Sequence, residues 1–340
     1  MDFSKLEKST ILVTGATGLL GKNIIKTLLR RNREEDAKIQ IIAVVRDKEK
    51  AQRIFGDDRN DILYAVGDIR TINLDPYEVD YIIHAASQTS SRAFVDQPVE
   101  TISVAIDGTR NLLEYAKGHP MKRFLYLSTM EVYGTPQTDE KIDEQHSTNL
   151  DAMQVRTCYP ESKRMCENLC ASYAAEYRVP INVLRLTQTF GPGVEYNDGR
   201  VFAEFARCSM EGRDITLKTK GETKRCYLHV EDAVDAILAV MTSDVAGEAY
   251  NVANEETYCS IYEMANMVAY SISNGTIKVK IEEEDHNASG FAPTLHMNLD
   301  TSKLRALGWS PRYGLEAMYR DMIASMKNSE SVIETTDNER

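Results

Sequence analysis

The sequence predicts an α/β fold, a doubly wound parallel sheet that carries a smaller C-terminal lobe. Short apolar runs alternate with helix-periodic segments through the first half of the chain, and a glycine-rich turn follows the first run. After Gly191 the loops lengthen and the expected elements become shorter. Short apolar strands that alternate with helices are typical of a parallel sheet with both faces covered. These observations predict a large first domain with a second lobe beside it.

The first expected strand is the apolar run at 11–13, and apolar residues in the segment after it recur with a helical period. The other strands of the sheet are expected at short apolar runs, 39–45, 62–66, 81–84, 124–128 and 181–186. Helical patterns fill the intervals, most clearly at 99–117 and 159–177. In the second lobe we expect shorter strands and helices at 215–217, 226–230, 231–241, 248–252 and 260–270.

These patterns place the first domain at residues 1–188 and most of the second lobe at residues 189–325. We expect one return to the first domain, at residues 226–245, because residues 230–241 have the pattern of a helix that can pack there. The last segment, 326–340, is polar and charged, so we expect it to be disordered.

Bulk composition excludes several functional classes. The chain has 340 residues, 42% hydrophobic and 27% charged, as expected for a soluble globular protein with one large or two coupled domains. Its net charge of −12 argues against a nucleic-acid-binding surface. No apolar run is long enough to cross a membrane and the N-terminus lacks a signal-peptide pattern, so we expect a cytoplasmic protein. The six cysteines lack zinc-site or disulfide spacing, and we expect no metal.

The most informative motif is the glycine-rich turn in residues 10–21, where Gly15, Gly18 and Gly21 separate the first strand from its helix. Glycine allows a sharp turn and a close approach of the backbone to a pyrophosphate, and a helix N-terminus offers free N–H groups to phosphates. An ordinary strand-to-helix turn is the alternative explanation. We favour dinucleotide binding, by Gly15, Thr17, Gly18, Leu19 and Leu20.

Arg46 lies at the end of the second strand, where a dinucleotide fold meets the adenosine ribose. Arginine suits a 2′-phosphate, so the sequence favours NADP over NAD. The alternative is a solvated Arg46, with Asp47 taking the ribose. The loops after the third and fourth strands would complete the site, with Asp68 near the adenine and small side chains against the cofactor: Asp68, Ile69, Ala85, Ala86 and Ser87.

Tyr159 and Lys163 are four residues apart and share one face of the expected helix. A lysine ammonium beside a phenol lowers the pKa of the tyrosine. Such a tyrosine can exchange a proton with a substrate hydroxyl while hydride moves to or from a nicotinamide. Thr129, at the end of the fifth strand, can hydrogen-bond the same substrate oxygen. A tyrosine and a lysine four residues apart are usually just neighbours on an exposed helix face. The glycine motif upstream favours a catalytic role here.

From about residue 10 to about residue 315 the chain resembles the extended short-chain dehydrogenases/reductases of the nucleotide-sugar epimerase/dehydratase group, above all their decarboxylase-like and 4,6-dehydratase-like members. The motifs that carry the resemblance are G-x-x-G-x-x-G, G-D-I, H-A-A-S, S-T-x-E-V-Y-G, Y-x-x-x-K, N-D-G-R-V, K-R-C-Y-L-H-V-E-D-A and L-G-W-x-P. The resemblance implies a Rossmann-type domain, a bound NAD(P) and transient oxidation of a sugar carbon, usually C4. It also implies a homodimer through the helices near 99–117 and 159–177.

The resemblance assigns Thr129, Tyr159 and Lys163 as the catalytic triad. In dehydratase- and decarboxylase-like members the glutamate corresponding to Glu131 acts on the 4-keto intermediate, where the ketone acidifies a neighbouring C–H group. Met130 stands where some dehydratases have an acid, which weakens a dehydratase assignment. A plain strand-end role for Glu131 is the alternative. The resemblance also predicts nucleotide-sugar contacts, from Ser87, Thr129, Gln188, Arg200 and Arg225.

Three functional hypotheses remain open at this point. The first is a redox-neutral epimerase, dehydratase or decarboxylase of a nucleotide sugar, which Glu131 favours. The second is an NADPH-dependent reductase of a keto sugar nucleotide or another carbonyl, which Arg46 favours. The third is a non-catalytic nucleotide-binding protein, which the retained Tyr159 and Lys163 disfavour. Ala105 replaces an asparagine usual in the family and leaves the fine positioning of the cofactor open.

Overall fold

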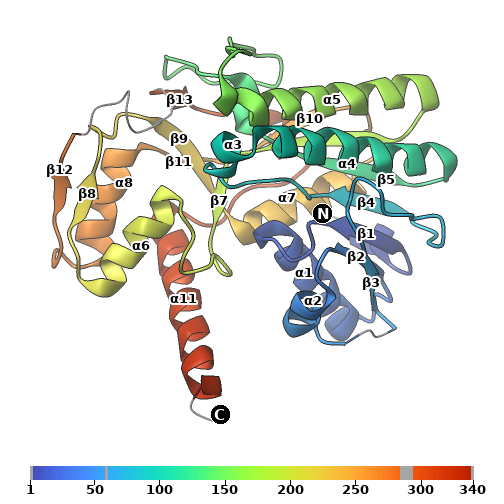
Figure 1. Cartoon of the computed structure of the whole chain (residues 1–340), viewed down its shortest axis with the longest axis horizontal. Coiled ribbons are helices and arrows are strands. Elements are labelled where there is room, and N and C mark those ends of the chain that lie inside the picture. The colour runs from blue at the N-terminus through green and yellow to red at the C-terminus, as the bar shows by residue number, and fades with distance from the viewer. Residues whose placement is uncertain (1–2, 58–59, 284–293, 338–340) are drawn as a thin grey trace.

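The centre of the molecule is a seven-stranded sheet in which every pairing is parallel (Figure 1). The computed structural model describes residues 3–57, 60–283 and 294–337, with the side chains of the last helix described as far as residue 328. The strand order is β10-β6-β5-β4-β1-β2-β3, the doubly wound arrangement that binds ligands at the carboxyl ends of its strands. The strands are β1 (Thr10–Thr14), β2 (Gln40–Val45), β3 (Ile62–Val66), β4 (Tyr81–His84), β5 (Arg123–Thr129), β6 (Ile181–Leu186) and β10 (Ala249–Val252).

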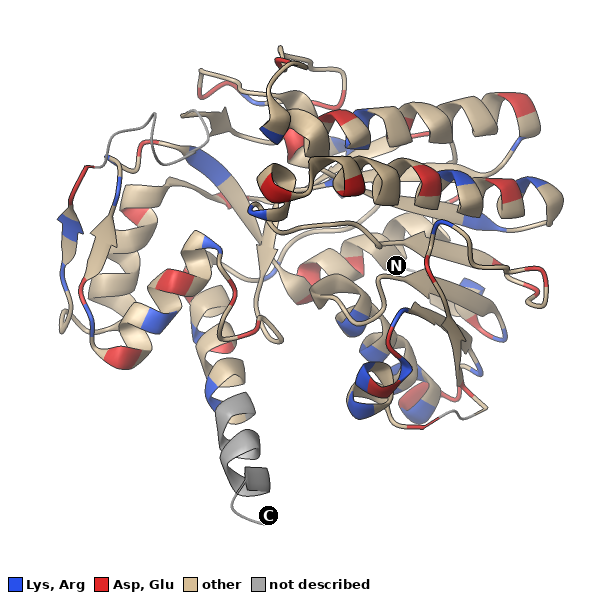
Figure 2. Cartoon of the chain, viewed as in Figure 1, with Lys and Arg blue, Asp and Glu red and all other residues tan. Residues whose placement is uncertain are grey.

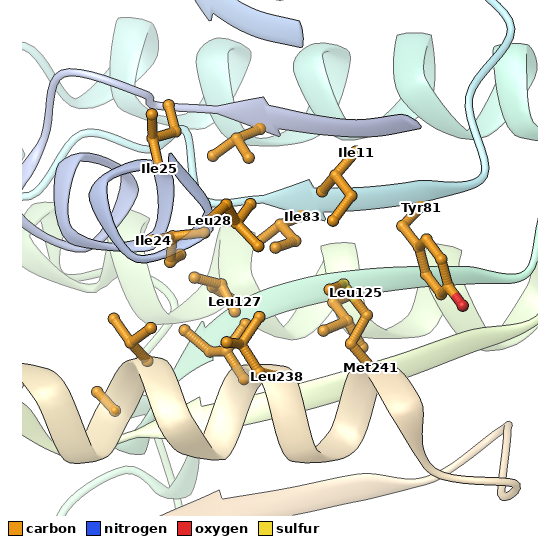
Figure 3. Packing of buried hydrophobic residues seen from close by; sticks show 14 of the residues in the cluster. Ile11, Ile24, Ile25, Leu28, Tyr81, Ile83, Leu125, Leu127, Leu238 and Met241 are labelled. Atoms are coloured by element: carbon orange, nitrogen blue, oxygen red, sulfur yellow. The ribbon is translucent and has the colours of Figure 1, made fainter. Parts of the chain in front are cut away.

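Helices cover both faces of this sheet, as the alternating pattern predicts. On one face, α1 (Leu19–Glu35) and α7 (Val230–Thr242) pack together and bury apolar residues against β1, β4 and β5, including Ile24, Leu28 and Leu238 (Figure 3). The same buried cluster includes residues of α2 (Lys48–Phe55). On the other face lie α4 (Pro98–Gly118) and α5 (Cys158–Tyr177), which pack side by side. The predicted fold class is confirmed.

One strand expected in the second lobe belongs instead to the main sheet. Residues 249–252 form β10, which pairs in parallel with β6 and closes that edge of the sheet. The reason is burial, because Tyr250 and Val252 join the apolar cluster beneath α7. The expected return segment, 226–245, does contain α7, but its first residues belong to β9 (Lys224–His229) in the second sheet.

The chain returns to the first domain once more, near its C-terminal end. Leu304, in the short helix α10 (Ser302–Arg305), and Trp309 are buried in the same apolar cluster as α7. The indole Nε1 of Trp309 donates a hydrogen bond to the carbonyl oxygen of Asp232 at 3.1 Å. The first domain is therefore completed by segments that follow the start of the second lobe.

The second lobe is built around β9, which pairs with β7 (Gln188–Phe190), β11 (Asn254–Ser260) and β13 (His296–Met297). A separate pair joins β8 (Ile215–Leu217) to β12 (Val279–Ile281). The helical elements α6 (Val201–Glu211), α8 (Ile261–Met267) and η4 (Val268–Ile272) pack here around one apolar cluster. Figure 2 shows acidic and basic residues interspersed along the outer helices α1, α2 and α4 of the first domain.

The last helix, α11 (Leu315–Asp337), continues well past residue 326, where we expected order to end. Its inner residues Met318, Met322 and Met326 recur every four positions and are buried in the second-lobe cluster. This spacing extends the packed face of the helix through Met326, and residues 338–340 lie outside the described part of the chain. Among the described residues, no helix combines the length and the apolar character needed to span a bilayer.

Candidate active site

The glycine-rich turn forms a cradle with no room for side chains. Gly15 has a φ of +64°, and a Cβ there would lie 2.8 Å from the backbone of Ala85 and Ala86. A Cβ on Gly21 would lie 2.2 Å from the carbonyl oxygen of Gly15. Gly18 precedes the first residue of α1 and no side chain caps that helix, so its first N–H groups remain available to phosphate oxygens. These features fit a dinucleotide pyrophosphate.

At the expected adenosine end, Arg46 is exposed directly after β2 and has no ion pair with any described residue. Asp47 instead caps α2, because its carboxylate accepts a hydrogen bond from the backbone N–H of Lys50 at 2.9 Å. Asp68 follows β3 and accepts hydrogen bonds from Arg70, which hold the pKa of this carboxyl down at about 2. Asp68 is therefore an ionised acceptor at the sheet edge.

The end of β4 is fixed by a buried hydrogen-bond chain. The hydroxyl oxygen of Thr14 accepts from the backbone N–H of Ala86 at 3.0 Å and bonds Nδ1 of His84 at 2.8 Å. Burial lowers the pKa of His84 to about 3, so this imidazole is neutral at physiological pH. These hydrogen bonds fix the position of the segment that carries Ala85, Ala86 and Ser87.

Ile69 and Ser87 were also expected to bind the cofactor, and both contact other parts of the protein. Ile69 is buried against the position of Gly108 on α4, where a Cβ would lie 2.8 Å from its side chain. The Ser87 hydroxyl donates to the carbonyl oxygen of Gln88 at 3.3 Å. Both residues follow the carboxyl ends of strands, at the edge where the cradle lies.

Thr129, Tyr159 and Lys163 come together where β5 ends and α5 begins. Lys163 is buried, and its Nζ donates to the carbonyl oxygen of Leu127 at 2.8 Å. This Nζ lies 6.0 Å from the ring centroid of Tyr159. The Tyr159 ring stacks on Phe94, from the short helix α3 (Ala93–Asp96), with centroids 4.3 Å apart and planes at 10°. Thr129, which is distant in sequence, therefore shares one buried cluster with Tyr159 and Lys163.

The protonation of Tyr159 differs from the sequence expectation. Burial raises the pKa of its phenol, and the negative charge of Glu131 raises it further, while a hydrogen bond with Thr129 acts in the opposite direction. We expected the Lys163 ammonium to lower this pKa, but that ammonium is hydrogen-bonded to the Leu127 carbonyl. Tyr159 is therefore a neutral phenol in this geometry, with a proton to donate.

We expect kcat/KM to fall as pH rises through about 8, because burial lowers the pKa of Lys163 from 10.5 to about 8 and its positive charge is then lost. Stability should change in the opposite sense. Between pH 10.5 and about 8, the Lys163 amine holds its proton in the unfolded chain but has largely lost it in the folded protein. The Lys163 contribution to the free energy of unfolding therefore rises with pH.

Profiles of kcat/KM and of urea unfolding against pH test both trends. Lys163→Met should remove the Lys163 contribution to the stability profile. A wild-type kcat/KM that stays constant up to pH 10.5 would contradict the expectation.

Glu131 lies in the turn η2 (Met130–Tyr133), directly after Thr129. Its Oε2 accepts a hydrogen bond from Nη2 of Arg156 at 3.0 Å, and both side chains are about one-third exposed. Met130 is buried in an apolar cluster shared with the second lobe, with Sδ 3.4 Å from the hydroxyl oxygen of Thr187. The neighbour of Glu131 therefore offers no proton donor to a substrate.

The residues expected to bind a nucleotide sugar fall in two groups. Nη1 of Arg225 donates to Oε1 of Gln188 at 3.4 Å, so β9 and β7 bring this pair together. The Nε of Arg225 is buried and has no hydrogen-bond partner among the described residues. Arg200 directly precedes α6 and its guanidinium is held by the carboxylate of Asp198, yet its charge still lowers the pKa of Tyr159.

Two residues of this cluster, Phe94 and Arg156, were not predicted from the sequence. Phe94 covers the ring of Tyr159, and Arg156 lies over the ring of Phe94 with its guanidinium carbon 4.9 Å from the centroid. The sequence did offer one signal for Arg156, which lies three residues before Tyr159 and therefore within reach of the same site. Nothing in the local sequence around Phe94 indicates its contact with Tyr159.

A family model described as the NAD dependent epimerase/dehydratase family matches residues 11–253. UDP-glucuronic acid decarboxylase 3 of Arabidopsis thaliana is 30% identical to this chain, over 92% of the chain and 88% of the relative. UDP-glucuronic acid decarboxylase 1 of Xenopus tropicalis is 29% identical, over 92% of the chain and 71% of the relative.

Solved structures show the same fold. The Thermotoga maritima UDP-glucose 4-epimerase with UDP-glucose superposes with a TM-score of 0.79 at 21% identity, over 94% of this chain and 99% of that one. The Bacillus cereus UDP-glucuronic acid 4-epimerase, in complex with UDP-glucuronic acid and NAD, has a TM-score of 0.77 at 20% identity, with the same coverage.

Proposed function

Because the chain belongs to the NAD-dependent epimerase/dehydratase family, we propose that it modifies a nucleotide sugar through transient oxidation of a ring carbon, usually C4. The observation that carries this proposal is the buried cluster of Thr129, Tyr159 and Lys163 beside the glycine cradle. Its placement at the carboxyl ends of parallel strands suits a dinucleotide and a sugar that meet there.

A bound nicotinamide would supply reversible hydride chemistry at this site, so no external reductant would be consumed. The backbone from Gly15 to Leu20 would hold its pyrophosphate, with Ala85 and Ala86 leaving room beside it. Lys163 would keep a positive charge near the reacting hydroxyl, and Thr129 would hold that hydroxyl toward Tyr159. Tyr159, once it has lost its own proton, would take the proton of that hydroxyl during oxidation and return it during reduction.

Glu131 supports chemistry on the ketone intermediate rather than simple epimerisation. A carboxylate near a carbon next to a ketone can take or return a proton there, because the ketone stabilises the resulting enolate. The buried Met130 leaves elimination of water without the neighbouring acid that some dehydratases have. Together with the relatives that are named UDP-glucuronic acid decarboxylases, this favours loss of CO₂ from a nucleotide uronic acid.

Two arginines support the nucleotide-sugar assignment. Arg225 has a buried Nε without a partner, and a guanidinium fork matches the oxygens of a diphosphate or a sugar hydroxyl. Arg200 lies close enough to affect Tyr159 electrostatically, as expected for a residue that closes a loop over the sugar. Gln188, paired with Arg225, would contact the same part of the substrate.

The experiment that tests the proposal is native mass spectrometry, followed by release of any dinucleotide and incubation with UDP-, dTDP-, CDP- and GDP-sugars. We expect retained dinucleotide and loss of CO₂ from a nucleotide uronic acid, without net formation of reduced cofactor. An isomer of unchanged mass would indicate epimerisation, and loss of water would indicate dehydration. Turnover only with stoichiometric NADPH consumption would overturn the redox-neutral proposal.

A second candidate is net reduction of a carbonyl with NADPH. Arg46 favours it, because this side chain is exposed and forms no ion pair with the described residues. If Arg46 binds a 2′-phosphate, Arg46→Asp should weaken NADPH binding by about 10–100-fold and change NADH binding little, since charge-assisted hydrogen bonds contribute about 1.5–3 kcal/mol. Calorimetric titration of both cofactors measures this. Arg53→Asp, on the exposed side of α2, is the control and should leave both affinities unchanged. Tighter binding of NADH than NADPH by the unaltered protein would contradict the NADP preference.

We also propose that two copies pair through α4 and α5, which lie side by side on one face of the sheet (Figure 1). Three large apolar residues are exposed on these helices: Val99, Ile102 and Met165. Their exposed fractions are 78%, 39% and 49%. Burial of such residues against the same helices of a second copy would form an apolar four-helix contact. The mass of the protein in solution, from light scattering, distinguishes a dimer from a monomer.

A further inference from the structure

Arg156 connects two parts of the active-site cluster that the proposed mechanism treats separately. It lies in the turn η3 (Val155–Thr157), just before α5, and Glu131 lies in η2 after β5. Its Nη2 donates to Oε2 of Glu131 at 3.0 Å. The same guanidinium lies over the ring of Phe94, 4.9 Å from its centroid, and Phe94 stacks on Tyr159.

The Glu131 carboxylate has one oxygen committed and one available. Among the described residues, the only hydrogen bond to this carboxylate is the one from Arg156 to Oε2. Arginine can hold a carboxylate through both oxygens, but here the contact joins only Nη2 of Arg156 and Oε2 of Glu131. Oε1 is thus left to a substrate, and its direction depends on the position of the guanidinium.

Arg156 is itself held in place by its surroundings. The Phe94 ring below it is buried, and the carbonyl oxygen of Phe94 accepts a hydrogen bond from the Cys158 thiol at 3.3 Å. The backbone N–H of Glu131 donates to the hydroxyl oxygen of Thr129 at 3.3 Å, which fixes the other end of the pair. A side chain anchored at both ends can orient a carboxylate more precisely than one in solvent.

We propose that Arg156 is a positioning residue that aims Glu131 Oε1 at the carbon next to the transient ketone. The inference rests on the proposed function and adds a residue to its second step. In that step the bond from this carbon to the sugar carboxylate breaks, CO₂ leaves, and the bonding pair becomes the enolate of the ketone. A proton that Glu131 has taken from solvent then passes from Oε1 to this carbon. Oxidation of the sugar by Tyr159 and the nicotinamide precedes this transfer and does not need the Glu131 carboxylate.

The two steps can be followed separately with the purified protein and its nucleotide-sugar substrate. Absorbance of the reduced nicotinamide reports the oxidation, and mass spectrometry reports product formation and solvent deuterium incorporation at the carbon. For Arg156→Met we expect oxidation within about threefold of wild type and product formation reduced by about 10²-fold, because a small misplacement of a reacting group has an effect of this size. Glu131→Gln should show the same split, and Arg156→Lys should recover part of the loss.

Arg92→Met is the matched control. Arg92 is an arginine just before α3 with a 90% exposed side chain, paired only with Asp96 among the described residues, and its loss should leave both steps unchanged. Equal loss of oxidation and product formation in Arg156→Met, or unimpaired product formation, would overturn the positioning role. No reduced nicotinamide in the wild-type protein with any nucleotide sugar would overturn the proposed function itself, and with it the role of Arg156.

Discussion

Replacement of Tyr159 by phenylalanine is expected to lower kcat by about 10³-fold, within the range for loss of a general acid–base group. The phenol is the group in the cluster with a proton to exchange, and it hydrogen-bonds Thr129. The aromatic ring remains in Tyr159→Phe, so its stacking on Phe94 and the shape of the site should be kept. Steady-state kinetics give the change in kcat, and calorimetry should show dinucleotide affinity within about threefold of wild type, because no contact to the pyrophosphate is removed.

Tyr177→Phe is the matched control for this substitution. Tyr177 ends the same helix, is 43% exposed and lies away from the sheet edge that carries the cluster. Its substitution should leave kcat unchanged. A fall in kcat of less than tenfold for Tyr159→Phe, with an unchanged melting temperature, would show that another group moves the proton.

Gly15→Ala is expected to remove bound dinucleotide and to lower the free energy of unfolding by about 2–4 kcal/mol. Two separate causes contribute to this loss. A side chain at a φ of +64° is strained, and the new Cβ would lie 2.8 Å from the backbone of Ala85 and Ala86. The backbone N–H of Ala86 donates a hydrogen bond to the hydroxyl oxygen of Thr14, so the segment after β4 cannot move away without breaking this bond. Urea unfolding and native mass spectrometry measure the two effects.

Gly212→Ala separates the strain from the crowding. Gly212 has almost the same φ, +67°, but a Cβ there would meet nothing within 4 Å. This variant should lose only about 1 kcal/mol and keep its dinucleotide. If the two variants lost equal stability and both kept the dinucleotide, the close approach at Gly15 would have no functional role.

Much of the fold could be predicted from the sequence, because its strands are short apolar runs separated by helices with a clear period. The element expected at 248–252 was assigned to the second lobe, because its neighbours in the chain belong there. Only the long-range burial of Tyr250 and Val252 and the pairing with β6 show that residues 249–252 belong to the main sheet. Local patterns do not contain this information. The catalytic motif was visible because Tyr159 and Lys163 are close in sequence.

The missing parts of the site depend on contacts between distant segments. Phe94 on α3, Glu131 on η2 and the pair Arg156 and Tyr159 around the start of α5 meet only after these three segments of the chain assemble. The pKa of Tyr159 likewise depends on burial in the folded protein, which raises it, so the lowering expected from the spacing to Lys163 is not seen. The preference of Arg46 for a phosphate stays a prediction.

The repeated returns of the chain to the main sheet constrain how this enzyme can be re-engineered. After the second lobe begins at β7, the chain returns to the first domain with α7 and β10, and again with α10 and Trp309. A fragment that stops at residue 188 would expose the apolar face of α1 that α7 covers. The substrate lobe therefore cannot be exchanged as a single cassette between related enzymes, and a chimera would need a compatible junction at every crossing.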